Sequence, residues 1–299
     1  MAPAQGDIRI GISGWRYAPW RGVLYPKGLR QRDELRFAAN RFRSIEINGT
    51  FYGPQYPPTF ARWAAETPAD FVFSVKAPRF ITHIRRLREP EAPLANFLAS
   101  GLLNLGSKLG PILWQFPPSF RYERAVLEPF LALLPHDTEA AARRAARHDD
   151  RIKDVALTPD AKRPMRHAIE IRHESFVDPD FIELMRDHQV ALVCADTVEW
   201  PRLMDLTADF VYCRLHGSEK LYASGYGDKA LDEWTARVEA WSHGQEPEDV
   251  QRVIAHDAPK RALRDVYVYF DNDIKVRAPF DAEGLAARLG IETPHEQVA

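Results

Sequence analysis

Short runs of apolar and β-branched residues alternate with longer stretches of helix-like periodicity along almost the whole chain. Two parallel strands need a crossover of a dozen or more residues between them, and that crossover is usually a helix. About eight strand-then-helix units in succession therefore predict one parallel sheet with helical crossovers. The length of 299 residues suits one large domain of this kind.

The expected elements follow from this alternation. We expect strands over residues 8–13, 44–48, 71–76, 112–116, 168–172, 190–195, 210–215 and 266–270. We expect helices over 29–42, 57–66, 93–109, 123–134, 178–188, 231–241 and 282–289. A segment at about 136–165 has too few apolar residues for a core of its own, so we interpret it as an insertion in a single domain spanning 1–299. The pattern over 245–264 fits neither a helix nor a strand clearly.

A doubly wound open sheet shares this order of elements. Such a sheet usually has a glycine-rich phosphate-binding turn after one of its strands. No strand end in this sequence has a GxGxxG or GxxxxGK[ST] pattern. We therefore expect an α/β fold of the TIM-like (β/α)8-barrel class, with parallel strands inside and helices outside.

Charge and hydropathy exclude some classes of partner. The formal net charge of −2 gives no general reason to expect nucleic acid or a membrane surface as a partner. No apolar run approaches the roughly 20 residues of a membrane-spanning helix, and residues 1–7 lack the features of a signal peptide. Cys194 and Cys213 form no CxxC pair and lie in apolar runs, as buried thiols do in a reducing compartment. We expect a cytoplasmic protein without a membrane partner.

Polar residues recur on one face of several expected strands, close to the carboxyl ends. Side chains alternate between the two faces of a strand, and the face of a barrel strand that meets the helices is apolar. We therefore expect the polar residues inside the barrel, at the end where barrel enzymes have their active sites. The sequence predicts one pocket that contains Glu46, Lys76, Glu170, Arg172, Asp196, Arg214, His216 and Asp271, with Asn48 and Gln115 at further strand ends.

A purely structural network is the alternative to a functional pocket. The four acids and three bases of this set would neutralise one another inside the barrel. Replacing a buried ionic network by apolar residues is often neutral or stabilising, so stability alone is a poor reason to keep one. We therefore favour a functional pocket.

Several short motifs are similar to those of a known family. Residues 11–15 read Gly-Ile-Ser-Gly-Trp, and Trp20 and Tyr25-Pro26 follow; the other motifs are Glu46-Ile-Asn48, Thr50-Phe-Tyr52, Lys76, Thr82-His83, Gln115-Phe-Pro-Pro118, Glu170-Ile-Arg172-His173, Asp196, Arg214-Leu-His216-Gly217 and Phe270-Asp-Asn-Asp273. In this order, from about residue 8 to 289, they resemble the domain of unknown function 72 (YecE-like) family. The resemblance implies a TIM-like barrel and supplies no reaction. Gly49, Phe176 and Val276-Arg277 depart from the family pattern, and a glycine is usual near the last pair.

Carboxylates and a histidine are the candidate catalytic groups: Glu46, Glu170, Asp196, His216 and Asp271. Two carboxylates serve as general acid and base when neighbouring groups such as Lys76 or Arg172 push their pKa values apart. The commonest retaining-glycosidase barrels have their carboxylates after the fourth and seventh strands. Gln115 and His216 occupy those ends here, which disfavours that mechanism.

Basic and aromatic residues predict an anionic ligand. Lys76, Arg172 and Arg214 are suited to holding a phosphate or carboxylate through charge-assisted hydrogen bonds. Aromatic residues of the expected loops would form a rim, among them Trp15, Trp20, Tyr52, Tyr56, Phe80, Tyr222 and Tyr226. The full set of expected substrate-binding residues is Trp15, Asn48, Tyr52, Lys76, His83, Gln115, Arg172, His173, Arg214, Asn272 and Asp273.

Two other function classes remain open. Glu170, Asp196, His216 and Asp271 would suit Mn, Mg or Zn in a metal-dependent isomerase-like or endonuclease-like barrel, but the nearby arginines compete for the carboxylates and no HExxH spacing is present. A non-catalytic anion-binding or nucleic-acid-associated protein is the second class. The only compact basic segment is His83 to Arg88, and such runs are usually solvated surface.

We therefore expect an enzyme without a cofactor that performs acid/base or hydrolytic chemistry on a phosphorylated or carboxylated small molecule. The sequence does not define the oligomeric state.

Overall fold

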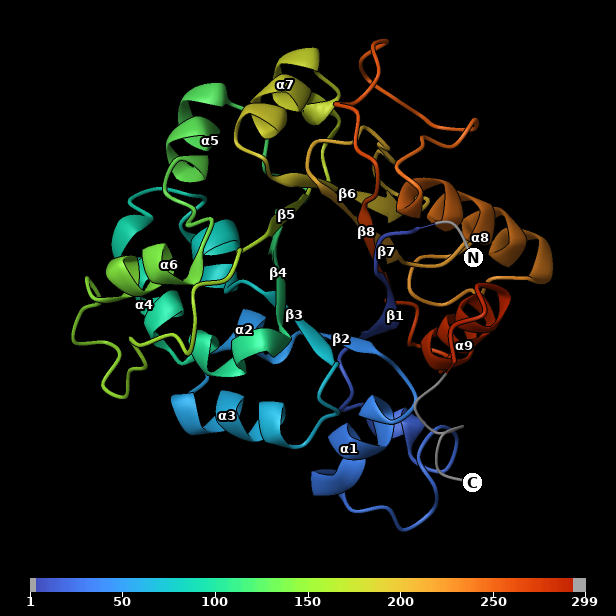
Figure 1. Ribbon diagram of the computed structural model, residues 1–299, viewed down its shortest axis with the longest axis horizontal. Helices are drawn as coiled ribbons and strands as arrows, with labels where there is room; N and C mark the ends of the chain where they lie inside the picture. The colour runs from blue at the N-terminus through green and yellow to red at the C-terminus, as the bar shows by residue number, and fades with distance from the viewer. Residues whose placement is uncertain (1–3, 293–299) are drawn as a thin grey trace. The chain divides into compact units, whose positions relative to one another are not determined.

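The computed structural model describes residues 4–292 (Figure 1). Its strands form a closed barrel in the order β1 to β8, each next to its neighbour in the chain, and helices surround the barrel. The pairs β3–β4, β4–β5, β6–β7 and β7–β8 are parallel, as is the β1–β8 pair that joins the first and last strands. This confirms the predicted TIM-like (β/α)8 class. Within residues 4–292, no helix combines the length and apolar character that a membrane crossing requires.

The chain forms two compact units, residues 46–176 and the remainder, and β2 straddles the boundary after Ile45. Unit 1 contains the first strand, the last three strands and the helices near both ends of the chain. Its elements are β1 (Ile8–Ser13), η1 (Ala18–Trp20), η2 (Gln31–Asp33), α1 (Glu34–Ala39), the start of β2 (Ser44–Ile47), α7 (Pro179–Asp187), β6 (Ala191–Asp196), β7 (Phe210–Leu215), α8 (Asp228–Ser242), β8 (Asp265–Phe270) and α9 (Ala278–Arg288).

Unit 2 contains the three middle strands of the chain. Its elements are α2 (Gly49–Tyr52), α3 (Pro57–Ala65), β3 (Val72–Lys76), η3 (Phe80–Ile84, a π-helical turn), α4 (Glu91–Ala99), η4 (Leu102–Lys108), β4 (Leu109–Gln115), α5 (Arg124–Leu131), α6 (Thr138–Ala145), β5 (His167–Glu170) and η5 (Glu174–Phe176). The predicted organisation as a single domain stays a prediction.

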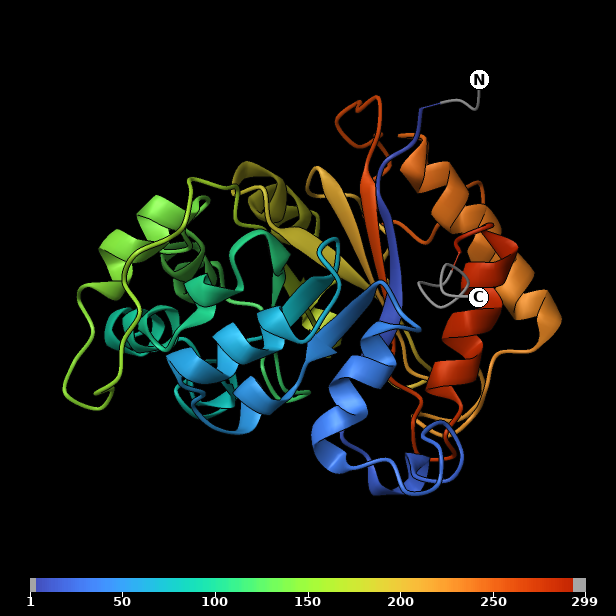
Figure 2. The same ribbon diagram turned by 60° about the horizontal axis from the view of Figure 1, so that its bottom comes forward.

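Helices α8 and α9 cover the apolar outer face of the sheet in unit 1. Figure 2 shows them side by side next to β1 and β8, and the contacts between these elements agree. Trp234 and Trp241 of α8 are buried, and Val266 and Val268 of β8 are completely buried. The core of this unit therefore lies between the strands and the two helices, as in other layered α/β structures.

Polar side chains from alternate strands meet inside unit 1. The hydroxyls of Ser44 on β2 and Tyr269 on β8 lie 2.6 Å apart, and β1 separates their strands in the barrel order. Arg214 on β7 donates to Ser13 Oγ on β1 at 3.3 Å, and β8 separates that pair of strands. Inward-pointing residues of alternate barrel strands form common layers, so these contacts agree with the predicted inward orientation.

Two expected helices are shorter than predicted. The pattern over 29–42 corresponds to a 3-10 turn, η2, followed by the short helix α1. The helix expected over 93–109 ends at Ala99. Gly101 has a φ of +111°, which lies in the left-handed region and not in the range of an α-helix. A Cβ at Gly101 would lie 2.4 Å from the Cα of Pro57, so only glycine fits there. Residues 49–52 and 80–84 form helical turns that the periodicity does not reveal.

The expected insertion packs within unit 2. Its helix α6 lies against α4, and the two helices are neighbours in Figure 1. Asp137 accepts a hydrogen bond from the amide of Ala140 and caps α6. Asn96 of α4 exchanges two hydrogen bonds with Asp149, at 3.0 and 2.9 Å. Side-chain caps and ties of this kind hold a segment that has few apolar residues of its own.

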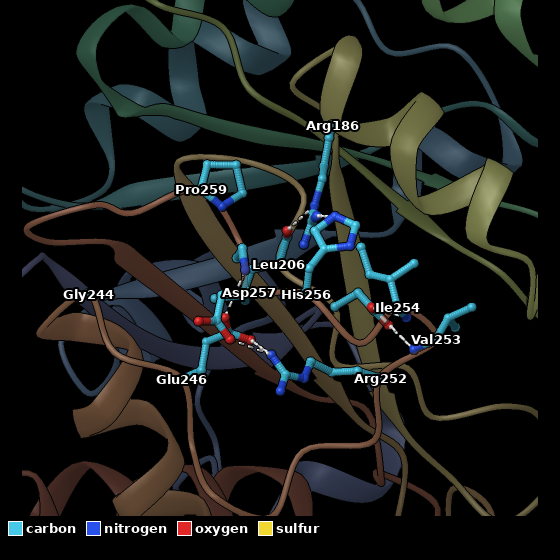
Figure 3. Close-up of polar contacts among 12 residues, drawn as sticks. Arg186, Leu206, Gly244, Glu246, Arg252, Val253, Ile254, His256, Asp257 and Pro259 are labelled. Carbon is cyan, nitrogen blue, oxygen red and sulfur yellow. Dashed lines mark hydrogen bonds and ion pairs between the residues drawn. The ribbon is translucent and has the colours of Figure 1, made fainter.

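The segment over 245–264 has neither a helix nor a strand, and ionic contacts fix it instead (Figure 3). Arg252 donates to Glu246 at 3.1 Å and lies 3.4 Å from Asp257. Arg186 of α7 donates to the carbonyl of Leu206 at 3.2 Å and lies 3.0 Å from His256. The sequence shows no periodicity here because the side chains are used for polar contacts rather than for one apolar face.

Candidate functional site

The backbone ladder of unit 1 brings three expected site residues to neighbouring strand ends. The amide of His216 donates to the carbonyl of Asp196 at 3.0 Å, and the amide of Asp271 donates to that of Leu215 at 2.9 Å. The ladder therefore continues one residue beyond β7 and β8. Gly217 then turns the chain with a φ of +113°, where a Cβ would lie 2.6 Å from the carbonyl oxygen of Lys220.

Arg214, His216, Asp271 and Asp273, which we name the Asp271 cluster, lie at the ends of β7 and β8. Arg214 Nη2 donates to Asp271 Oδ2 at 2.9 Å, and His216 Nδ1 lies 3.1 Å from the same oxygen. The side chains of Arg214 and His216 are completely buried, and that of Asp271 is 15% exposed. One carboxylate thus faces both a buried guanidinium and a buried imidazole.

Aromatic rings enclose the His216 imidazole. The ring centroids of Trp200 and Tyr222 both lie 5.4 Å from that of His216, in edge-to-face arrangements. Rings in this geometry pack closely and fix the orientation of the imidazole. Trp200 and Tyr222 come from the segments that follow β6 and β7, so the loops complete what the strand ends begin.

The pKa of Asp273, in the same cluster, is raised. Burial and then the charge of Asp271 raise its pKa from 3.8 to about 6, although a hydrogen bond from Tyr17 and the charge of Arg214 oppose the rise. A carboxyl group that titrates near pH 6 is suited to acid/base catalysis. Asp271 and Asp273 therefore differ in surroundings, because Asp271 is the one that accepts from Arg214.

Asp196 is engaged in a different set of contacts. Its carboxylate accepts from Arg202 at 3.0 Å and from the indole of Trp234 at 3.3 Å. Burial and then the charge of Asp196 raise the pKa of Tyr226 well above its usual range, and the Tyr226 hydroxyl accepts from the amide of Gly217 at 3.1 Å. Asp196 thus organises the loops after β6 and β7.

Asn272 is completely buried and holds two neighbouring segments together. Its side-chain amide donates to the carbonyl of Ser224 at 2.9 Å and to Asp281 at 2.7 Å. A few residues further, Val276 has a φ of +56°, which is strained for a β-branched side chain.

Unit 2 has a cationic group of residues around His83. Lys76 ends β3, Arg79 precedes η3, His83 lies in η3 and Arg172 follows β5; we name these four the Lys76 cluster. The Lys76 Nζ lies 4.4 Å from the centre of the Phe51 ring, a cation–π contact. The His83 ring meets the same phenyl ring edge-to-face, 5.0 Å between centroids.

The pKa of His83 depends on the charged side chains around it. Burial, then Lys76, Arg172 and Arg79, lower its pKa from 6.5 to about 4, and the charge of Glu170 opposes them. His83 is therefore neutral at pH 7. Three cationic groups against one carboxylate make these surroundings favourable for an added negative charge.

Glu170 is completely buried and accepts two hydrogen bonds at one oxygen. Gln115 Nε2 donates to Glu170 Oε1 at 3.0 Å, since the two residues are register partners on β4 and β5. Arg172 Nε donates to the same oxygen at 2.7 Å. The carboxylate of Glu46, also completely buried, belongs to unit 2 as well.

The remaining expected site residues differ widely in exposure. Tyr52 is 73% exposed, whereas Trp15 is 5% exposed and its carbonyl accepts from the Tyr25 hydroxyl at 2.5 Å. His173 Nδ1 accepts from the amide of Ser175 at 3.0 Å, which orients the imidazole locally. Asn48 Oδ1 is buried and has no hydrogen-bond partner in the described part of the chain.

The expected aromatic rim is correct only in part. Trp20 and Tyr226 are buried, as Trp15 is, because their rings pack beneath loops. Tyr56 and Phe80 are exposed, like Tyr52. The exposed members of the expected rim thus come from the segments after β2 and β3.

The basic segment His83 to Arg88 is largely used for internal contacts. Arg85 pairs with Glu89, and Arg86 donates to the hydroxyl of Ser119 at 2.6 Å. Leu87 is buried. Part of the segment's basic character is therefore used within unit 2, and the expectation that nucleic acid is not a partner stays a prediction.

The expected metal-ligand set divides between the two units: Glu170 belongs to unit 2, and Asp196, His216 and Asp271 belong to unit 1. Across residues 4–292, no group of three or more His, Cys, Asp or Glu side chains is arranged to hold a metal ion. Cys194 and Cys213, register partners on β6 and β7, are buried free thiols, as expected.

The structure thus brings together Arg214, His216 and Asp271 in one unit, and Gln115, Glu170 and Arg172 in the other. That all the expected residues share one pocket stays a prediction. Sequence reasoning missed Phe51 and Arg79 as members of a site. The Pro78-Arg79 pair directly after a strand was a signal for Arg79, since a strand end followed by proline marks a loop at the rim of a barrel.

Two curated proteins have sequences similar to part of this chain. The UPF0759 protein YunF of Bacillus subtilis (strain 168) is 29% identical over 118 residues, 38% of this chain and 41% of that protein. The UPF0759 protein YecE of Escherichia coli (strain K12) is 30% identical over 129 residues, 43% of this chain and 44% of that protein. The matched parts thus span less than half the length of these curated relatives.

Solved structures with the same fold include a DUF72 family protein from Thermotoga maritima MSB8, with a TM-score of 0.70, 24% identity and coverage of 95% of this chain and 99% of that one. Another is a DUF72 family protein from Enterococcus faecalis V583, with a TM-score of 0.68, 19% identity and coverage of 95% and 96%. The family model described as "Protein of unknown function DUF72" matches residues 9–298. The chain therefore belongs to the DUF72 family.

Proposed function

We propose that this protein is an enzyme that performs acid/base or hydrolytic chemistry on an anionic small molecule. The observation that carries the proposal is the position of His216 Nδ1, 3.1 Å from the carboxylate of Asp271 in a buried setting. A carboxylate this close to one imidazole nitrogen stabilises the protonated form of the ring through its charge, and in the proposed reaction the other nitrogen exchanges a proton with a substrate.

The other members of the Asp271 cluster support proton transfer. Arg214 is the second partner of Asp271, and its hydrogen bond keeps that carboxylate in place. Asp273, whose pKa is raised to about 6, supplies a carboxyl group that titrates near neutral pH. Two acidic groups with different surroundings are the usual basis for a general acid and a general base in one enzyme.

The Lys76 cluster supports an anionic substrate. Lys76, Arg79 and Arg172 all act against the protonation of His83, so a phosphate or carboxylate nearby would be stabilised by the same charges. In this proposal the Asp271 cluster transfers protons and the Lys76 cluster attracts the anion. Cytoplasmic location stays a prediction alongside this function.

Incubation of the protein with the anionic fraction of a metabolite extract tests the proposal. Mass spectrometry should show at least one anionic compound consumed by the wild type and left intact by His216→Gln, with rates at least roughly 100-fold apart. His256→Gln is the matched control, because that imidazole is 65% exposed. Both variants are first checked for an unchanged circular dichroism spectrum. Consumption of every compound at the same rate by His216→Gln would overturn the assignment of His216, and no consumption by the wild type would overturn the enzyme.

A further inference from the structure

A cavity of about 610 Å³ lies in unit 2 among the segments that follow β2 and β3, helix α4 and the insertion. Small-molecule sites typically have volumes of roughly 300–1,000 Å³. Its lining includes the apolar side chains of Phe51, Phe80, Ile81, Ile84 and Phe97. The cavity therefore has the size and the lining of a site for an organic ligand rather than for an isolated inorganic ion.

Exposed apolar side chains gather at this cavity. Tyr52, Phe80 and Ile84 line it, with exposures of 73%, 39% and 60%. Large exposed apolar side chains that occur together mark binding surfaces more often than scattered ones do. These three come from only two segments of the chain, the turn α2 and the π-helical turn η3.

The backbone beside the cavity is unusual in the same segment. A π-helical turn forms η3, and turns of this kind are frequent at functional sites. Arg86, Leu87 and Glu89, which follow it directly, have φ values of 51°, 62° and 46°. Left-handed conformations at three such residues cost free energy, and a surrounding structure that maintains them often does so for a binding or catalytic purpose.

Most polar groups in the wall are already bonded within unit 2. Thr50 donates to the carbonyls of Ile47 and Lys76, Ser100 donates to that of Phe97, and Asn96 and Arg151 both bond to Asp149. These groups give the wall its shape, and their hydrogen bonds are used within the protein.

Arg79 and Gln55 differ from those groups. Both line the cavity, and neither side chain has a hydrogen bond or an ion pair with another residue between 4 and 292. The guanidinium of Arg79 is exposed, and its planar donors match a carboxylate, sulfonate or phosphate. The cavity thus offers one cationic donor group at an otherwise mainly apolar wall.

Phe51 links the cavity to the Lys76 cluster. Its ring forms part of the cavity wall and is also the ring that Lys76 and His83 contact. Arg79 belongs to both sets as well, since it lines the cavity and acts electrostatically on His83. Apolar volume and positive charge therefore adjoin through these two residues.

We infer that this cavity binds the apolar body of an amphipathic organic anion, which is an aryl or acyl group. The carboxylate, sulfonate or phosphate of this anion is held by the Lys76 cluster, through Arg79 at the cavity wall. The inference rests on the proposed function in one respect, because it takes the expected substrate to be anionic. It goes further by defining the rest of the molecule as apolar, which separates this class from sugar phosphates.

Calorimetric titration with three probes tests this inference: sulfate, naphthalene-2-sulfonate and the uncharged 2-naphthol. We expect naphthalene-2-sulfonate to bind at least roughly tenfold more tightly than either of the others, because only it uses both the charge and the apolar wall. If sulfate binds as tightly as naphthalene-2-sulfonate, the apolar part of the inference is wrong while the anionic substrate of the proposed function stands. If neither anion binds, this inference fails, whereas the proposed function fails only if the wild type consumes no anionic compound of the extract.

Variants of the cavity wall locate the binding. Arg79→Gln should weaken naphthalene-2-sulfonate roughly tenfold, with the exposed Arg32→Gln as its control. Ile84→Asn should weaken it roughly threefold to tenfold, with Val198→Asn, 57% exposed in unit 1, as its control. Binding that is unchanged in both Arg79→Gln and Ile84→Asn would place the ligand elsewhere and overturn the inference.

Discussion

Opposite charges meet in the Asp271 cluster, whereas like charges surround His83 in the Lys76 cluster. Arg214 and Asp271 form a buried ion pair that a second partner, His216, shares. In the Lys76 cluster, three cations act on one neutral imidazole, and the charge of Glu170 opposes them. The first arrangement holds protonatable groups in place, and the second is suited to attracting a charge from outside the protein.

Removing one arginine from each cluster should change stability to very different extents. Arg214→Met leaves Asp271 without its guanidinium partner in a mostly buried setting, so we expect a loss of roughly 3–5 kcal/mol in the free energy of unfolding. Arg79→Met removes an exposed side chain and should change the same quantity by less than about 0.5 kcal/mol. Urea unfolding measures both. Equal losses in the two variants would remove the distinction between the clusters.

The raised pKa of Asp273 should have a smaller effect on the free energy of unfolding, and this effect depends on pH. Because its folded-state pKa is raised to about 6, the folded state binds more protons than the unfolded state between pH 4 and 6. The stability that this carboxyl contributes is complete below its unfolded pKa of about 3.9 and is lost as the pH rises through about 6. Replacing it by a neutral amide should therefore favour folding more at pH 7.5 than at pH 4.5.

Urea unfolding of Asp273→Asn and the wild type at both pH values checks this prediction. The difference between the two proteins should change by about 1 kcal/mol in favour of the variant at the higher pH, after a reduction for solvent screening of a partly exposed group. A difference that is the same at pH 4.5 and pH 7.5 would show that Asp273 is not perturbed.

The strand-borne part of the site was predictable because strands encode orientation with a period of two. The alternation around Arg214 and His216, and around Glu170 and Arg172, was sufficient to place these residues on one face of their strands. Register then determines neighbours, and this is why Gln115 bonds to Glu170. The barrel itself followed from the repeated strand-helix order.

The loop-borne part was not predictable in the same way. The positions of Arg79 and Phe51 depend on short helical turns, α2 and η3, which are too brief to show a period. The raised pKa of Asp273 depends first on its burial in the fold, which no pattern in a loop sequence shows. By contrast, the break after Ala99 had a visible signal in Gly101, since an isolated glycine within a helical pattern often marks its end.

Measurement of the His83 pKa tests most directly the central claim that the Lys76 cluster is cationic and binds anions, because this pKa depends on the charges of that cluster. A nuclear magnetic resonance titration, with the His83 signal assigned from His83→Gln, should give a pKa of about 4 in the wild type. Lys76→Met should raise this pKa toward 6.5, and saturating sulfate, whose charge is constant over this range, should raise it in the wild type. A His83 pKa near 6.5 that neither the substitution nor sulfate changes would contradict the existence of a cationic, anion-binding cluster.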